Sequence, residues 1–307
     1  GNTEARYGRG SQKESRAGAA RSLSRWADFE CRVPGKWVLC GEHAVLRGAT
    51  AVALPHPEFA LTLRFKAGGG DLRITVTEGR DAVRELIDAV IEREGEEERS
   101  VERPRGELVI ESTIPIGSGL GSSAALCVAL MRWMSEPLRL ERDRDFDFAR
   151  ELENRFHGSS SGMDIAAVMS GKPIAYTMGR APERLEIRKL PRFTFHDTGL
   201  RARTSECVFR VDRKREEAPM LALETDDLMR RASRACMQGL AQFDAGVLDA
   251  GLANLAQGME QAHEAFLRWE LVPAEALRMR EQQLREGAIS ARLTGAGGGG
   301  FVVALWK

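Results

Sequence analysis

Alternating apolar and polar residues run through the first quarter of the chain, which is the pattern of half-buried β-strands. Two such segments flank a glycine turn, so residues 59–65 and 72–76 are expected to form a β-hairpin. Residues 83–91 instead place apolar side chains on one face at helical spacing, which predicts an amphipathic helix. Further strands are expected at residues 29–33, 37–40 and 51–54.

A glycine- and serine-rich segment at residues 117–123 separates two apolar stretches. Residues 107–113 before it are strand-like, and residues 124–134 after it form an apolar run without a helix breaker. This order predicts a strand, a tight turn and then a buried helix that begins near the serines.

Helical periodicity dominates the rest of the chain. Residues 143–157 fit an amphipathic helix, and the spacing of Ser161 and Asp164 is that of a capping box at the start of another helix. The pattern of residues 219–285 is almost wholly helical, with breaks near its middle and at Pro273. Short strands are expected at residues 172–177, 185–187, 192–195, 292–294 and 301–306.

This order of elements predicts an α+β fold, because β-rich material precedes a helical block and the two do not alternate regularly. A length of 307 residues is enough for two domains. We expect a disordered tail at residues 1–25, an N-terminal domain at 26–184 and a C-terminal domain at 185–307. The tail has no hydrophobic region, so it is not a secretory signal.

Composition narrows the class of protein. The formal net charge is zero, so no whole-chain field favours nucleic acid. No apolar run reaches the ~18 residues that span a bilayer, so no membrane segment is expected. Five scattered cysteines without a C-x-x-C pair indicate reduced thiols and a cytoplasmic protein, and they argue against a zinc site.

The segment at residues 117–123 is the strongest candidate for ligand binding. A helix N-terminus offers unpaired N–H groups and a positive dipole end, which attract phosphate, and Gly117, Gly119 and Gly121 allow close approach. The alternative is an ordinary glycine-rich connection with a serine cap. The segment is not a Walker A loop, because no lysine follows its last glycine.

Candidate acids and bases follow this segment, and each has a structural alternative. Asp164 is expected at a helix start, where it could act in chemistry or as a cap. Glu151 and Glu153 are two residues apart on a helix, so only one of them can face a shared site. His43 and His157 are candidate ligands that local backbone could equally satisfy.

Four motifs occur in a fixed order at residues 34–46, 115–125, 153–164 and 293–300. They read P-G-K-W-V-L-C-G-E-H-A-V-L, P-I-G-S-G-L-G-S-S-A-A, E-N-R-F-H-G-S-S-S-G-M-D and L-T-G-A-G-G-G-G. Together they resemble the GHMP kinase superfamily, and their spacing is most similar to its mevalonate kinase branch. The resemblance implies an N-terminal domain of the ribosomal-protein-S5 type and a C-terminal ferredoxin-like domain with a helical block.

The resemblance also implies roles for particular residues. Asp164 matches the catalytic aspartate and Lys36 the lysine beside it, while Ser123 and Glu153 match the Mg²⁺ ligands. The match thereby favours Glu153, and not Glu151, as the acidic Mg²⁺ ligand. The residues that match the ATP phosphate loop are Pro115, Gly117, Ser118, Gly119, Leu120, Gly121, Ser122 and Ser123. The residues that match substrate-side positions are Glu42, His43, His157, Ser161, Thr204 and Gly297.

The activity implied is transfer of the γ-phosphoryl group of ATP, with Mg²⁺, to the primary hydroxyl of mevalonate, a small-molecule substrate. A homodimer is compatible with this reading. One alternative is a sister activity on phosphomevalonate or a sugar, and another is a catalytically inactive sensor. The presence of Lys36, Ser123, Glu153 and Asp164 argues against the sensor. Ile165 stands where mevalonate kinases often carry Asn, which bears on the choice of acceptor.

Overall fold

The computed structural model describes residues 25–96, 101–157 and 161–307, and its strands belong to two sheets in that part of the chain. The larger sheet has six strands in the order β3-β4-β2-β5-β6, and β1 also pairs with β2. Its strands are β1 (Phe29–Cys40), β2 (Ala51–Ala67), β3 (Arg73–Val76), β4 (Gly106–Ser112), β5 (Ile174–Tyr176) and β6 (Glu183–Arg184). The expected segments on either side of Pro34 are therefore one continuous strand, whose register shifts between Pro34 and Lys36.

The predicted hairpin of residues 59–65 and 72–76 is wrong. Strand β4 lies between β2 and β3, where Phe65 pairs with Leu108 and β3 runs parallel to β4. Parallel neighbours need a long crossover, and α1 (Arg80–Glu96) provides it. The alternating pattern identified the strands correctly, but it contains no information about which strand lies beside which.

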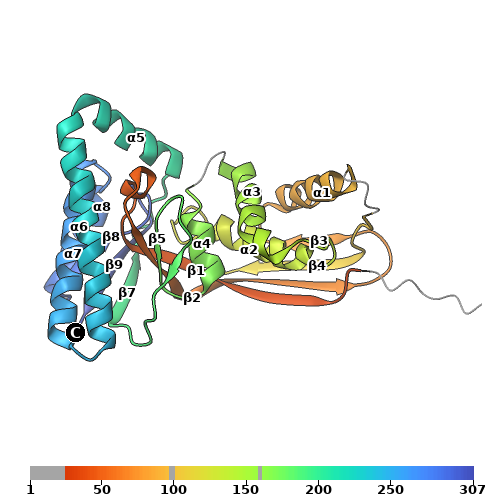
Figure 1. The fold of residues 1–307 in the computed structure, drawn as a ribbon, viewed down its shortest axis with the longest axis horizontal. Coiled ribbons are helices and arrows are strands. Elements are labelled where there is room, and N and C mark those ends of the chain that lie inside the picture. The colour runs from red at the N-terminus through yellow and green to blue at the C-terminus, as the bar shows by residue number, and fades with distance from the viewer. Residues whose placement is uncertain (1–24, 97–100, 158–160) are drawn as a thin grey trace, which may run out of the picture.

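Helices α1, α2 (Ser122–Ser135), α3 (Asp145–His157) and α4 (Met163–Ser170) lie along the larger sheet (Figure 1). Helix α2 is the most deeply buried of the four and packs against β1, β2, α3 and α4. Its apolar side chains, including Trp133 and Leu130, are almost fully inaccessible. The unbroken apolar run therefore forms the buried helix that was predicted, because partners surround it on several sides.

The predicted capping box at Ser161 and Asp164 is also wrong. Helix α4 begins at Met163 after Gly162, which has a left-handed backbone (φ 79°), and no side chain caps this N-terminus. Ser161 Oγ instead accepts a hydrogen bond from the Met163 N–H over 3.2 Å. The carboxyl group of Asp164 is therefore available for another partner.

The smaller sheet, in the order β7-β9-β8, lies beside a group of long helices (Figure 1). Its strands are β7 (Arg192–Asp197), β8 (Ser290–Leu293) and β9 (Phe301–Trp306). The helices are α5 (Thr204–Glu217), α6 (Pro219–Asp244), α7 (Leu248–Arg268) and α8 (Ala274–Arg285). Helices α6 and α7 pack so closely that a Cβ atom on Gly258 would stand 2.4 Å from Cys236 Sγ. The pattern of residues 219–285 predicted helices α6, α7 and α8 and both breaks between them.

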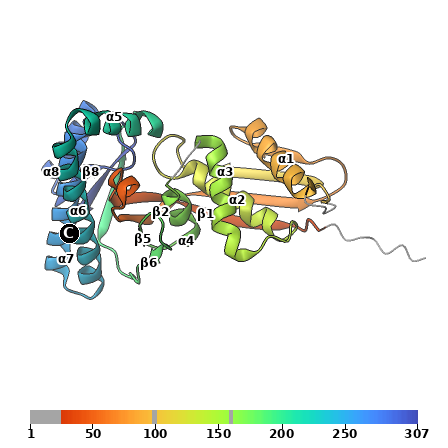
Figure 2. The same cartoon turned by 45° about the horizontal axis from the view of Figure 1, so that its top comes forward.

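Helix α5 was not predicted, and the short strand expected at residues 185–187 is instead β6, two residues earlier. In both views α5 lies across one end of the α6–α7 pair (Figures 1 and 2). Its sequence is mostly charged, and only Cys207 and Val211 are buried. That apolar face is too narrow to give a clear helical signal.

The contacts that join the halves of the chain include an ion pair at the 3-10 helix η1 (Ala44–Arg47) and a ring contact at β1. Arg47 forms a two-bonded ion pair with Asp226 of α6, with N–O distances of 2.5 and 2.6 Å. The Trp37 ring of β1 packs edge-on against Phe193 and Phe195 of β7. The segment that follows β1 is therefore held against α6, and β1 itself packs against the smaller sheet.

All five cysteines are free, and four of them are buried, as expected for small core residues with reduced thiols. Within the residues that the structure describes, no helix is long and apolar enough to cross a bilayer.

Candidate active site

A buried lysine and a partly exposed aspartate meet beside the glycine-rich segment. Lys36 Nζ lies 2.9 Å from Asp164 Oδ1, and 3% of the Lys36 side chain is exposed against 38% of the Asp164 side chain. The bulge in β1 directs Lys36 to this position, and the start of α4 carries Asp164. The pair therefore combines a charge held in the interior with a carboxylate that a bound molecule can reach.

The segment at residues 117–121 forms a tight loop that ends at the N-terminus of α2. Gly117, Gly119 and Gly121 all have positive φ, between 69° and 82°. Gly121 is the N-cap residue, and no side chain caps the helix, so the alternative of a serine cap is wrong. Ser122 and Ser123 begin the helix and are half-buried. The helix therefore presents its first N–H groups and its positive dipole end at the loop.

Side chains of the loop fix its shape from within. Ser118 is buried and donates its hydroxyl hydrogen to the Pro115 carbonyl over 2.5 Å. Leu120 is buried, and its carbonyl accepts a hydrogen bond from the Lys36 N–H at 2.9 Å. A Cβ atom on Gly121 would stand 3.0 Å from Lys36 Cγ. The loop and the lysine are therefore in direct contact.

The three glycine-containing motifs, far apart in sequence, pack against one another. A Cβ atom on Gly35 would stand 2.9 Å from the Leu120 carbonyl oxygen, and one on Gly119 would stand 3.3 Å from Gly295 Cα. A Cβ atom on Gly300 would stand 2.6 Å from the Ser118 carbonyl oxygen. The loop at residues 295–300 therefore contains glycine because the backbone of another loop approaches it closely.

Glu151 and Glu153 point to different surroundings, as their spacing on α3 predicts. Glu151 is half-exposed and pairs with Arg93 of α1 over 2.5 Å. Glu153 is 2% exposed, and its charge is close enough to Cys127 on α2 to help raise the pKa of that thiol, after the larger effect of burial. Cys127 lies one helical turn after Ser123, so Glu153 lies against the first turns of α2.

Glu42 is buried, and its carboxylate is bound within the protein. Arg292 of β8 donates from Nη1 and Nη2 to its two oxygens, each over 2.9 Å, and the Gly295 N–H donates to Oε2 over 3.1 Å. The Arg292 guanidinium is fully buried and also stacks over the Phe266 ring. Sequence reasoning missed Arg292; the only signal was a cation two residues before Thr294 in an otherwise apolar strand.

His43 lies next to Glu42 and binds the same loop. Its Nε2–H donates to the Ala296 carbonyl over 2.6 Å, and its ring packs edge-on against Phe266 and Trp269. Burial lowers the pKa of His43 to about 4, although the bond to Ala296 acts in the opposite direction. The imidazole is therefore neutral at pH 7 and fixes the loop at residues 295–300.

The remaining expected substrate-side residues lie near the start of α4, at the start of α5 and in the loop at residues 295–300. Ser161 stands two residues before the start of α4. Gly297 accepts a hydrogen bond from the Cys207 thiol of α5, and Thr204 begins that helix with an exposed side chain. The side chain of His157 lies outside the described part of the chain. Ile165, the departure beside Asp164, is fully buried in the core.

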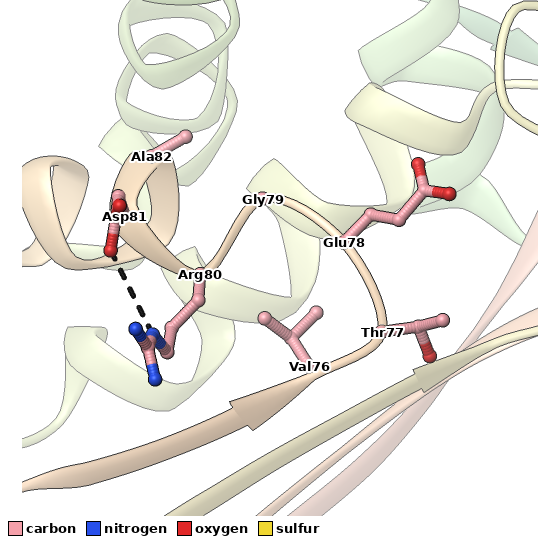
Figure 3. Close-up of a pocket in the computed structure, with 7 residues that line it drawn as sticks. All are labelled: Val76, Thr77, Glu78, Gly79, Arg80, Asp81 and Ala82. Carbon is pink, nitrogen blue, oxygen red and sulfur yellow. Dashed lines mark ion pairs between the residues drawn. The ribbon is translucent and has the colours of Figure 1, made fainter.

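A hollow elsewhere on the surface contains none of these residues. It is lined by the turn between β3 and α1, where Arg80 and Asp81 form an ion pair over 3.7 Å (Figure 3). All of its lining residues belong to one segment, Val76 to Ala82. The hollow brings together no groups from different parts of the fold.

Comparison with known proteins identifies the family. The family described as GHMP kinases N terminal domain matches residues 82–172. A mevalonate kinase of Archaeoglobus fulgidus is 30% identical over 284 residues, which cover 89% of this chain and 91% of the relative. The crystal structure of L. major mevalonate kinase in complex with R-mevalonate has a TM-score of 0.74 at 23% identity, over 90% of this chain and 86% of that chain.

Structural similarity alone does not separate the branches of this family. A Streptococcus pneumoniae phosphomevalonate kinase in complex with phosphomevalonate and AMPPNP matches at a TM-score of 0.70 and 16% identity, over 91% of this chain and 92% of that chain. The sequence match to the A. fulgidus protein is the finding that separates them. The chain belongs to the mevalonate kinase family, within the GHMP kinases.

Proposed function

We propose that this protein transfers the γ-phosphoryl group of ATP to the primary hydroxyl of mevalonate in a Mg²⁺-dependent reaction. The observation that carries the proposal is the contact between Lys36 and Asp164 at the edge of a glycine loop that ends at a helix N-terminus. Membership of the GHMP kinases implies the use of ATP.

Asp164 acts as the general base in this proposal. Its carboxylate is partly exposed, so an acceptor hydroxyl can approach it, and it takes the hydroxyl proton as the oxygen attacks the γ-phosphorus. The Lys36 ammonium lies 2.9 Å from the carboxylate, where it stabilises the negative charge of the transition state. Phosphoryl transfer depends mainly on such alignment and charge neutralisation.

The loop from Pro115 to Ser123 binds the phosphate groups of ATP. Uncapped N–H groups at the start of α2 and the positive backbone φ of the loop glycines create a concave, electropositive surface. Buried Ser118 and Leu120 keep the loop in this conformation before ATP arrives. ATP therefore binds without a large cost of ordering the loop.

Ser123 and Glu153 would hold Mg²⁺. A hydroxyl and a carboxylate are oxygen ligands of the kind that this ion prefers, and both lie at the first turns of α2. The described residues contain no cluster of three or more His, Cys, Asp or Glu side chains, so nucleotide oxygens and water would complete the coordination. When bound, Mg²⁺ neutralises charge on the β- and γ-phosphates.

The proposed acceptor side is formed by residues at the end of α3, before α4, at the start of α5 and in the loop at residues 295–300. His157, Ser161, Thr204 and Gly297 are its proposed contacts. Glu42 and His43 are proposed to fix the shape of this acceptor side, since their described hydrogen bonds run to Gly295 and Ala296. We further propose domains at residues 26–184 and 185–307, a cytoplasmic location and a homodimer.

The acceptor is tested by an ADP-release assay with mevalonate, phosphomevalonate, homoserine and galactose. The highest kcat/KM is expected with mevalonate. A higher value with phosphomevalonate or galactose would support the alternative of a sister kinase. ATP binding without ADP release for any acceptor would support the alternative of an inactive sensor.

A further inference from the structure

We infer that Arg201 is a further nucleotide-binding residue, which reaches the ATP phosphates from the second half of the chain. It belongs to none of the four sequence motifs and lies in the turn between β7 and α5. The inference rests on the proposed function, because it concerns the same nucleotide site. It adds a cation at the end of the loop opposite to Lys36.

The position of Arg201 is defined by its contact with the phosphate loop. A Cβ atom on Gly117 would stand 3.8 Å from Arg201 Cδ and 3.9 Å from Arg201 Cβ. At the other end of the loop, a Cβ atom on Gly121 would stand 3.0 Å from Lys36 Cγ. The side-chain stems of two cationic residues, Arg201 and Lys36, therefore lie at opposite ends of the loop that begins α2.

The turn that carries Arg201 is fixed to both glycine loops. The Leu200 carbonyl accepts hydrogen bonds from the Gly300 N–H at 2.8 Å and from Arg201 Nη1 at 2.9 Å. Gly300 in turn lies against the Ser118 carbonyl. The backbone of Arg201 is thus held in place relative to residues 117–118 by packed main chain, which is the kind of support that a binding group needs.

The guanidinium is also oriented and remains accessible. It donates from Nη1 and Nη2 to the Asp197 carboxylate, over 2.8 and 2.9 Å, and it lies 5.8 Å from the centre of the Phe301 ring. About a third of the side chain is exposed (33%). The guanidinium has five N–H donors, and its described bonds use only Nη1 and Nη2, so donors remain for a phosphate oxygen.

The ion pair with Asp197 is not a sufficient reason for this arrangement, because exposed ion pairs contribute little to stability. The chain contains a matched pair, Arg213 and Glu217, with the same spacing of four residues and the same 2.8 Å separation. That pair is on the outer surface of α5 and has no described contact with the phosphate loop. Of these two pairs, it is the Arg201 pair that lies beside the loop that we propose binds phosphate.

The test measures binding of ATP and of adenosine to the full chain and four variants by calorimetry or competition. Arg201→Gln should weaken ATP binding by about 10- to 100-fold, the usual effect of losing a charge-assisted hydrogen bond. It should change adenosine binding less than about twofold, since adenosine has no phosphate. Arg201→Lys, which keeps the charge, should fall between the parent and Arg201→Gln.

Two controls complete the experiment. Arg213→Gln removes the same charge from the matched pair and should leave both affinities unchanged. Asp197→Asn should keep or strengthen ATP binding, because the guanidinium then lacks its competing carboxylate. Parental ATP affinity in Arg201→Gln, or equal losses for ATP and adenosine, would overturn the inference. A parent protein that does not bind ATP would instead refute the proposed function.

Discussion

The loop at residues 117–121 and the loop at residues 295–300 are both rich in glycine, yet their glycines have different surroundings. A Cβ atom on Gly117 would have no neighbour closer than 3.8 Å. Cβ atoms on Gly297, Gly298, Gly299 and Gly300 would each stand 2.6–2.8 Å from another residue. Gly297 to Gly300 of the second loop therefore leave no room for a side chain, whereas Gly117 of the first loop needs glycine for its left-handed backbone and for the phosphate that we propose its loop binds.

This comparison shows that one composition can have two physical causes. The second loop supports the first, because Gly295 and Gly300 pack against Gly119 and Ser118. Glu42, His43 and Arg292 hold the second loop from beneath. The account predicts that changes in the second loop lower stability, whereas changes in the first mainly alter ligand binding.

The largest expected effect is on stability at Gly300. Gly300→Ala combines a φ of 92° with a 2.6 Å collision against the Ser118 carbonyl, so the free energy of unfolding should fall by about 3 kcal/mol or more. Gly117→Ala has a similar φ of 69° without the collision and should lose only about 1 kcal/mol. Urea unfolding of both variants measures the difference. Equal losses would remove the distinction between the loops.

The second effect concerns Mg²⁺, which we expect to bind beside the first loop and not beside the second. Glu153→Gln should raise the Mg²⁺ concentration for half-maximal activity by about 10- to 100-fold, because a charged ligand is lost. Glu151→Gln, two residues away and paired with Arg93, should have little effect. Titration of ADP release with Mg²⁺ distinguishes them. If the two variants behaved alike, the assignment of Glu153 would be wrong.

The third effect is a pH dependence of the second loop. His43 has a pKa of about 4 in the folded protein and an ordinary value of 6.5, so between these values the unfolded chain binds a proton that the folded chain does not. Stability is therefore complete above pH 6.5 and falls as the pH decreases to 4, by about 3 kcal/mol for this residue. His43→Gln should flatten the unfolding free energy over that window; an unchanged slope would contradict the account.

The smallest expected effect is on ATP binding at Gly117. A methyl group on Gly117 would stand beside the path of the phosphates, so Gly117→Ala should weaken ATP binding about three- to tenfold. Gly246→Ala is the control, since Gly246 has a φ of 88° and no neighbour within 4 Å of its Cβ position. Calorimetric titration with ATP compares them. An unaltered affinity in Gly117→Ala would argue against phosphate at this loop.

Local patterns predicted most elements but not how they pair. The apolar run of α2 and the breaks between α6, α7 and α8 follow from periodicity, which is a property of neighbouring residues. The predicted hairpin was wrong because β4, which begins more than thirty residues after the start of β3, lies between β2 and β3. Helix α5 was missed because its stability depends on contacts with α6 rather than on its own apolar face.

The motifs predicted the candidate catalytic residues. They did not predict the residues that hold the loops of the site in place. The resemblance identified Lys36 and Asp164, and the structure brings them to 2.9 Å. The spacing of Glu151 and Glu153 showed that they face different surroundings but not which of them is buried. Arg292 and Arg201 lie outside strong motifs, and their importance depends on contacts with residues that are distant in sequence.

The unit formed by Lys36 and Asp164 is the centre of the proposed mechanism, and Asp164→Asn tests it most directly. Asparagine keeps the shape of the side chain but cannot accept the hydroxyl proton. The variant should bind ATP as the parent does and stay folded at the assay temperature, although its melting temperature should fall because the buried Lys36 ammonium loses its charged partner. Its single-turnover rate with mevalonate should be about 10²- to 10⁴-fold lower. A rate close to that of the parent would show that Asp164 is not the base and would contradict the mechanism.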